Sequence, residues 1–481
     1  MFDEREYNMK IISLKIRTII QLFAFVVLTF LVPMLTVSAD MLQQKPNILY
    51  INVDDLGWTD LSYQGSTFYQ TPHIDKLASQ GMIFTNAYAP ATNCSPSRAC
   101  CLTGQYTPRH GVYTVVNYRG DAKDRKLIPI KNTPYIKDNN LTIAHVLRAS
   151  GYRTCTIGKW HISNDPLKNG FDVNIAGGSM GDPEQGYYSP YRYPNCEQKE
   201  KGEYLTDRLT KEAIRFITAN KEEPFFLYLA FYTVHIPLQA KPDKQAFYAK
   251  KRKNDAHNNP AYAAMIESLD ENVGQLMDVI ERFGIAQNTF ILFTSDNGGV
   301  WEWSKQWPLR AGKGSYYEGG IRVPMVVRWP GKTNSGSVCN VPVSGIDFFP
   351  TFLEVAGSKK PPGKLLDGVS LIPLLTQSGP IKERPLFWHF PIYLGHGNSE
   401  SRDPKFRTRP GSVIRLGDWK LHQYFEDAGL ELYNLKNDIG EKVNLVDKEP
   451  GKVKELQDIL TAWRKDTGAP VPRELNPKYK P

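Results

Sequence analysis

The sequence predicts an α/β protein: a large mixed, mostly parallel β-sheet flanked by helices, then a smaller C-terminal α+β subdomain with a short antiparallel sheet. Four short apolar runs resemble buried parallel strands, and polar residues follow each of them: 47–53, 152–158, 224–231 and 288–295. Helical patterns lie between these runs, and strands that alternate with helices are typical of a parallel sheet. After residue 378 short strands alternate with turn residues. We therefore place the larger domain at 40–378 and the subdomain at 379–481.

Residues 1–39 are predicted to be a signal peptide. Lys10, Lys15 and Arg17 precede an apolar run over 19–37 that ends in small residues at Ser38 and Ala39. A basic segment, an apolar segment and small residues at the cleavage site, in that order, are typical of secretory leaders. We therefore expect a periplasmic or secreted protein.

Two features of this leader leave alternatives open. The apolar run is long enough to span a bilayer if it is not cleaved, which would give a membrane-anchored protein. Pro33 and the small residues after it favour cleavage. Acidic residues before Met9 are unusual in a leader, so Met9 is a second candidate for the first residue.

The first predicted strand, 47–53, ends at a pair of carboxylates, Asp54 and Asp55, followed by Leu56 and Gly57. Two adjacent carboxylates form a site for a hard cation when other oxygen ligands converge on them. Taken alone, the pair is better interpreted as a solvated turn.

The other three strands deliver polar residues in the same way. Strand 152–158 is followed by Lys159 and His161, strand 224–231 by His235, and strand 288–295 by Asp296 and Asn297. Ligands of open α/β sheets bind outside the carboxyl ends of the strands. Because the pattern recurs, we expect these side chains to form one site.

The predicted helices supply the core. Segment 261–283 carries apolar residues at helical spacing, and Gly284 follows it as a C-terminal cap. Segments 141–150 and 204–220 have a similar pattern. In the subdomain the sequence predicts one amphipathic helix and three short strands: 453–464, and 412–415, 419–422 and 430–433.

A short run, Cys94-Ser-Pro-Ser-Arg98-Ala-Cys-Cys-Leu102-Thr-Gly104, resembles the signature of the type I sulfatases, in which Cys-x-Pro-x-Arg is followed by Leu-Thr-Gly. The resemblance extends from Asn47 to about Pro472, and the motifs within it occur in the same order as in the family. It implies an alkaline phosphatase-like fold. It also implies that a maturation enzyme converts Cys94 to formylglycine, whose hydrate attacks sulfur with one hydroxyl and releases sulfate with the help of the other. Without the resemblance, Cys94 is read as a buried structural thiol.

The resemblance also implies a metal site. Asp54, Asp55, Asp296 and Asn297 would hold one divalent cation, usually calcium in this family, together with the modified residue 94. All of these ligands are oxygen atoms, which suits a hard ion and argues against zinc.

The remaining roles follow from the same resemblance, with Asp296 taking the proton of the attacking hydroxyl. Arg98 would lie one helical turn after residue 94 and contact both the nucleophile and the metal ligands. Lys159 and Lys313 would bind sulfate oxygens, and His235 would support the leaving oxygen together with Lys313. His161 would remove the proton that triggers release of sulfate. The Glu318-Gly-Gly-x-Arg322 element after Lys313 would be mainly architectural.

Cysteine spacing and net charge limit the classes of metal, ligand and partner that the sequence predicts. The six cysteines, at 94, 100, 101, 155, 196 and 339, have no zinc-like spacing and suggest no disulfide framework. The formal net charge of +9 is compatible with an anionic substrate. No nucleic-acid module is recognisable, and no membrane contact is expected beyond the leader.

The sequence does not distinguish between aryl sulfates and sulfated carbohydrates as the substrate, and it slightly favours a sulfated glycan. Trp301, Trp303 and Trp307 are candidates for a sugar-stacking entrance, and segment 388–391 is a second candidate. Two other functions remain as alternatives. One is a phosphatase or phosphonate-ester hydrolase of the same superfamily, and the other is a non-catalytic protein that binds sulfated glycans.

Overall fold

The computed structural model describes residues 8–17, 21, 45–115 and 122–480. The predicted signal peptide therefore lies largely outside the described residues, although residues 8–17 are helical. Contacts divide the chain into two units, residues 1–45 and Pro46–Pro481, and the second is described below. Among the helices of the described ranges, none combines the length and the hydropathy that a bilayer crossing requires.

An eight-stranded sheet forms the centre of this unit, in the order β5-β4-β6-β1-β7-β8-β2-β9. The strands β5, β4, β6, β1 and β7 are parallel neighbours, and β8 alone runs against both of its neighbours. The bounds are β1 Asn47–Val53, β2 Met82–Phe84, β4 Arg153–Gly158, β5 Val173–Ile175, β6 Phe225–Ala230, β7 Thr289–Ser295, β8 Met325–Arg328 and β9 Ser337–Cys339. The predicted mixed, mostly parallel sheet is confirmed, and the four strands expected from sequence are its adjacent strands β4, β6, β1 and β7.

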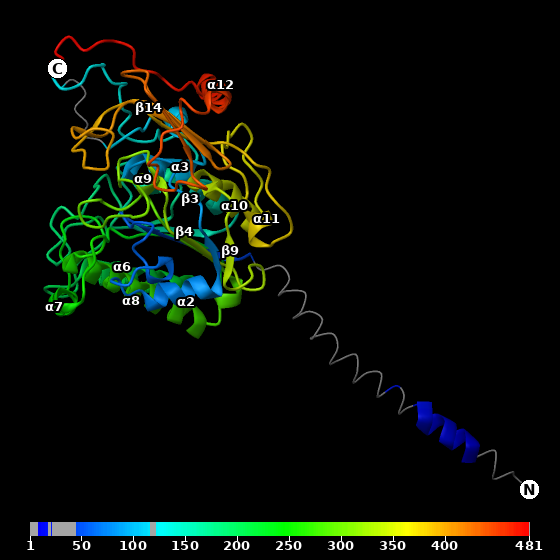
Figure 1. Cartoon of the computed structure of the whole chain (residues 1–481). Coiled ribbons are helices and arrows are strands. Elements are labelled where there is room, and N and C mark those ends of the chain that lie inside the picture. The colour runs from blue at the N-terminus through cyan, green and yellow to red at the C-terminus, as the bar shows by residue number, and fades with distance from the viewer. Residues whose placement is uncertain (1–7, 18–20, 22–44, 116–121, 481) are drawn as a thin grey trace, which may run out of the picture. The chain divides into compact units, whose positions relative to one another are not determined.

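Helices cover both faces of this sheet (Figure 1). On one face lie α2 (Pro72–Gln80), α6 (Leu205–Asn220) and α8 (Pro260–Arg282), and α7 (Pro242–Lys250) packs on α8. On the other lie α3 (Cys94–Thr103), α5 (Ile143–Ala149) and α10 (Phe348–Val355). Each face of the sheet packs on its own hydrophobic core, and strand β1 contributes to both. Leu49, Ile51 and Val53 lie in the core on the first face, and Ile48 and Tyr50 lie in the core on the second.

The C-terminal residues form the predicted antiparallel sheet, in the order β11-β14-β15-β16. Its bounds are β11 Leu386–Phe390, β14 Gly411–Leu416, β15 Trp419–Tyr424 and β16 Leu430–Asn434, and α12 (Pro450–Thr467) packs on it. Helix α12 is longer than expected because Pro450 begins it and Gly468, with φ of 65°, ends it. The domain boundary at 378/379 stays a prediction.

Smaller elements complete the unit. Two-stranded sheets pair β3 (Ala87–Tyr88) with β10 (Val343–Ser344), and β12 (Leu394–Gly395) with β13 (Phe406–Thr408). The short helices are α4 (Thr107–His110), α9 (Glu318–Ile321) and α11 (Ile372–Leu375).

Strand β11 was not expected, and it overturns one prediction. Trp388, proposed from sequence as part of an entrance, is 1% exposed, and its indole N–H donates to the Ala89 carbonyl. Segment 388–391 therefore does not reach a cavity mouth.

Helix α3 lies between the two main sheets, and this position explains why every residue in it is buried. Ala99, Cys101 and Leu102 join the core of the large sheet, whereas Cys100 joins a cluster with Ile414 and other residues of the C-terminal sheet. Because the helix packs on both sheets, the position of its first residue, Cys94, is fixed.

Buried ion pairs connect α9 to the C-terminal sheet. The Glu318 carboxylate accepts from Lys420 Nζ at 2.9 Å and from Arg322 Nε at 2.8 Å, and Lys420 Nζ also lies 2.9 Å from Glu441 Oε1. Burial alone would raise the pKa of Glu318, but Lys420 and Arg322 outweigh it and lower that pKa. The Glu318–Arg322 element therefore has a structural role, as expected from sequence.

Replacing Lys420 by methionine should destabilise the protein, because it leaves Glu318 and Glu441 buried next to each other without their shared cation. The loss of a single partner from a buried ion pair costs about 3–5 kcal/mol of unfolding free energy. Urea denaturation measures the change, with the exposed Lys436→Met as the matched control. A loss under about 1 kcal/mol, as in a surface pair, would contradict this role.

Candidate active site

The carboxylates predicted to meet do so at the ends of two neighbouring strands. Parallel pairing of β1 with β7 sets Val53 opposite Ser295, so Asp54 and Asp55 lie beside Asp296 and Asn297. The Asp55 N–H donates to Asp296 Oδ1 at 3.2 Å, and Asn297 Nδ2 donates to Asp55 Oδ1 at 2.8 Å. The sheet register thus brings together residues more than 240 positions apart.

Cys94 begins α3 and faces these residues. The helix has Pro96 in its first turn, a position that tolerates proline because its missing N–H has no partner within the helix. One ligand atom each from Asp54, Asp55, Cys94 and His235 lie within 4.8 Å of one another. Burial raises the pKa of the Cys94 thiol, so an unmodified cysteine here would be a neutral and weak nucleophile.

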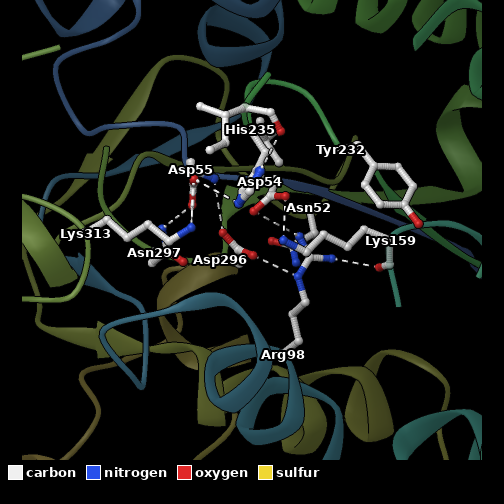
Figure 2. A network of polar contacts seen from close by, with 12 residues as sticks. Asn52, Asp54, Asp55, Arg98, Lys159, Tyr232, His235, Asp296, Asn297 and Lys313 are labelled. Carbon is white, nitrogen blue, oxygen red and sulfur yellow. Dashed lines mark hydrogen bonds and ion pairs between the residues drawn. The ribbon is translucent and has the colours of Figure 1, made fainter. Parts of the chain in front are cut away.

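Three cationic side chains each hold one of the carboxylates, as Figure 2 shows. Lys159 Nζ donates to Asp54 Oδ2 at 2.6 Å, and Lys313 Nζ donates to Asp55 Oδ2 at 2.8 Å. Arg98 Nε donates to Asp296 Oδ2 at 2.8 Å, so Arg98 contacts one of the four residues predicted to bind the metal.

These pairs shift the ionisation of the carboxyl groups. Burial would raise the pKa of Asp55, but Lys313 and His235 outweigh it, so the pKa of Asp55 is lowered. Burial raises the pKa of Asp54, against the opposing effect of Lys159. A further positive charge beside Asp54 would therefore stabilise its ionised form.

Both predicted histidines lie at this site. His235 Nε2 is 3.7 Å from Asp55 Oδ2, and burial together with Lys313 lowers the pKa of His235 to about 3. Burial and Lys159 also lower the pKa of His161. Both imidazoles are thus neutral at neutral pH, a form that can accept a proton.

The residues fit a hard divalent cation. Asp54 Oδ1 and Asn297 Oδ1 are buried oxygen atoms without a hydrogen-bond partner, which is rare for polar atoms unless an ion or water contacts them. Together with Asp55 and Asp296 they provide an oxygen-rich set. Three carboxyl groups face three cationic side chains, so a bound divalent ion would give this site the positive charge that an anionic substrate requires.

A cavity of about 540 Å³ opens from this cluster. Cys94, His161, His235 and Lys313 are among its lining residues, whereas Lys159 is fully buried behind Asp54. Four other residues of the cavity wall were not predicted from sequence, because they lie in loops and short strands without a motif: Tyr135, Asp182, Glu184 and Arg407.

The tryptophans proposed as an entrance are not among the lining residues. Lys305 Nζ lies 5.4 Å from the ring centre of Trp301 and 4.7 Å from that of Trp307, while Trp303 packs against the core. Their stacking role is not supported by this geometry.

Gly181, which carries no motif in the sequence, also contributes to the site. A Cβ atom at Gly181 would lie 2.4 Å from His161 Cε1, so the backbone of this loop packs directly on the imidazole. His161 has a φ of 65°, and its N–H donates to the Gly178 carbonyl. The loop therefore fixes the orientation of His161.

Comparison with known proteins gives a consistent result. Residues 46–358 match the family model described as Sulfatase, and residues 312–466 match the model described as N-sulphoglucosamine sulphohydrolase, C-terminal. A protein named Sulfatase from Formosa agariphila is 33% identical, over 89% of this chain and 90% of its own length. The human N-acetylgalactosamine-6-sulfatase is 32% identical, over 72% of this chain and 68% of its own length.

Among solved structures, that of Ps i-CgsB in complex with k-i-k-neocarrahexaose resembles this chain with a TM-score of 0.74 and 30% identity. The similarity covers 88% of this chain and 94% of that one. The sequence-based resemblance and the structural one thus agree over most of Pro46–Pro481.

Proposed function

This chain belongs to the sulfatase family and is a sulfuric ester hydrolase, and from this premise we propose that it hydrolyses sulfate monoesters of carbohydrates at the cavity beside Cys94. In the active protein Cys94 is converted to formylglycine, and one calcium ion is held by Asp54, Asp55, Asp296 and Asn297. The observation that carries the proposal is the position of Cys94. It lines a cavity and lies within 4.8 Å of Asp54 and Asp55, in a set of oxygen ligands drawn from two strand ends.

The side chains of this site can be assigned parts in the reaction. Formylglycine supplies a hydrated aldehyde whose hydroxyl is the nucleophile, and calcium supplies positive charge beside it. The Lys313 ammonium, oriented by Asp55 at the cavity wall, binds a sulfate oxygen. Lys159, which was predicted from sequence to bind sulfate, does not line the cavity and is here assigned to balance the charge of Asp54. Arg98 holds Asp296 in the orientation needed to take a proton from the attacking hydroxyl.

The two histidines serve the proton transfers. His235 lines the cavity beside Lys313, where the two residues support the oxygen of the departing alcohol. His161 is neutral and is clamped by the loop at Gly181, so it is positioned to take the proton that accompanies release of sulfate.

A carbohydrate is favoured as the alcohol because of the cavity wall. Asp182 and Glu184 provide hydrogen-bond acceptors, and Arg407 and Tyr135 provide donors, which together suit the hydroxyl groups of a sugar. The relatives named above support the same class: one acts on a sulfated amino sugar by its name, and one was crystallised with a carrageenan-type oligosaccharide by its title.

Export is part of the proposal. The basic, apolar and small-residue segments of residues 1–39 support a leader that takes the chain to the periplasm or the medium. Cell fractionation with an antibody against the mature domain tests it, and a protein found only in the cytoplasm would contradict it.

Kinetics on matched substrates tests the proposed function. The matured protein should hydrolyse 4-nitrophenyl sulfate with a higher kcat/KM than 4-nitrophenyl phosphate, and defined sulfated mono- and disaccharides better than either. A faster reaction with the phosphate ester would instead assign the chain to phosphoryl transfer. Glycan binding without turnover by the matured protein would support the non-catalytic alternative.

A further inference from the structure

A second pocket, of about 330 Å³, lies on the C-terminal subdomain and shares no lining residue with the cavity at Cys94. Strand β15 and the residue after it, Phe425, form one wall, and the end of α12 with the segment after it forms the other. The lining residues are Gln423, Phe425, Thr461, Arg464, Lys465, Ala469, Val471 and Arg473. Three of these residues are cationic and none is acidic, so the pocket has the charge of an anion site.

Arg464 is the fixed element of this pocket. Its guanidinium donates to Gln423 Oε1 at 2.7 Å and to Thr461 Oγ1 at 3.2 Å, and it lies 5.7 Å from the ring centre of Phe425. Both hydrogen-bond partners are neutral. Within the described part of the chain Arg464, Lys465 and Arg473 form no ion pair, so their charges remain available to an external anion.

The ionisation of Arg464 supports this interpretation. Burial lowers the pKa of Arg464, and no carboxylate offsets the effect. The buried arginines 98, 310 and 322 behave in the opposite way: burial lowers their pKa values, but neighbouring carboxylates or phenols outweigh it. Arg464 is therefore a partly desolvated cation that a bound anion would stabilise.

One small buried cluster connects the basic pocket with residues of the active-site cavity. Leu127, Tyr393 and Phe406 form a small buried cluster, and Phe425 packs against it from the side of the basic pocket. The residues that follow Tyr393 and Phe406 along the chain, Leu394 and Arg407, line the active-site cavity.

We propose that the pocket at Arg464, Lys465 and Arg473 is a second binding site for a sulfated polysaccharide, which holds a sulfate group of the chain whose other residue occupies the cavity at Cys94. This proposal rests on the proposed function, because it takes the substrate to be a sulfated carbohydrate. A guanidinium held by two hydrogen bonds and two exposed cations match the sulfate groups, and the Phe425 ring offers a face for a sugar. The site would increase affinity for long chains without taking part in the chemistry.

The test uses the full chain, with dextran sulfate as the probe, and measures binding rather than turnover. A triple variant, Arg464→Gln, Lys465→Gln and Arg473→Gln, should raise the Kd for dextran sulfate by about tenfold or more, because it removes the charge-assisted hydrogen bonds that the pocket offers to sulfate groups. The matched control, Lys332→Gln, Lys359→Gln and Lys360→Gln, removes the same charge from exposed positions elsewhere and should change the Kd less than about twofold. A double variant at the exposed Lys465 and Arg473 alone avoids any folding defect and should show an intermediate loss.

Three outcomes would overturn the proposal: no change in Kd in the triple variant, an equal change in the control, or equally tight binding of double-stranded DNA that the triple variant also loses. The first would show that the pocket does not bind, the second that only net charge matters, and the third that the pocket accepts any polyanion. Failure of the proposed function would be recognised separately, because a wild-type protein that hydrolyses no sulfate ester would still give a decisive binding result.

Discussion

Replacement of Cys94 by alanine removes sulfate ester hydrolysis, with an expected fall in kcat/KM of at least about 10⁴-fold, comparable to the loss of a nucleophile in other covalent enzymes. The reason is chemical, because alanine provides no group that can be oxidised and hydrated. The fold should persist, since Cys94 is the first residue of α3 and the helix is held by residues 99–102 in two cores. Initial rates with 4-nitrophenyl sulfate and far-ultraviolet circular dichroism measure the two effects.

The control for this variant is Cys339→Ser, another buried cysteine, which lies on the edge strand β9 outside the cavity. It should retain most of the activity. If Cys94→Ala kept more than about 1% of the wild-type kcat/KM, residue 94 would not be the nucleophile and the mechanism would be wrong.

Removal of calcium is expected to have the second largest effect, a fall of about 10³-fold or more in kcat for protein treated with EGTA, because the positive charge beside residue 94 is lost. Added calcium should restore activity and also raise the Tm, since a ligand at 100 times its Kd stabilises the folded state by about 2.7 kcal/mol. The thermal shift reports on binding independently of turnover.

Asp55→Asn identifies the site of this effect, because it removes a charged ligand that lies at the centre of the cluster. The calcium-dependent rise in Tm should disappear in this variant and persist in Asp418→Asn, whose side chain is exposed. Full activity of metal-free wild-type protein would contradict the account, and so would a higher activity with zinc than with calcium.

Much of the fold could be predicted from sequence because its central strands are buried on both faces. The strands β1, β4, β6 and β7 are six or seven residues long, almost entirely buried and built around apolar residues, so each stands out from its surroundings. The strands β2, β5, β8 and β9 have only three or four residues, too few for a periodic pattern. Their order, and the reversed direction of β8, depend on long-range contacts.

Some residues of the site could likewise be predicted from the sequence and others could not. Asp54, Asp296, Lys159 and His235 could be predicted because the carboxyl ends of parallel strands meet at one edge of a sheet. Asp182 and Arg407 could not, because they reach the cavity from a loop and from the short strand β13, which carry no motif. The prediction for Trp388 was wrong, and the prediction for Trp301, Trp303 and Trp307 is not supported, because an aromatic residue near a site in sequence can equally pack against a core or beneath a lysine.

The central claim is that residue 94 acts as formylglycine in the oxygen-rich cluster, and peptide mass spectrometry of active protein from its native host tests it most directly. The account predicts that the peptide containing residue 94 has lost a sulfur atom and two hydrogens and gained an oxygen, and that the converted fraction rises in proportion to specific activity. Fully active protein in which this peptide carries an unmodified cysteine would contradict the account.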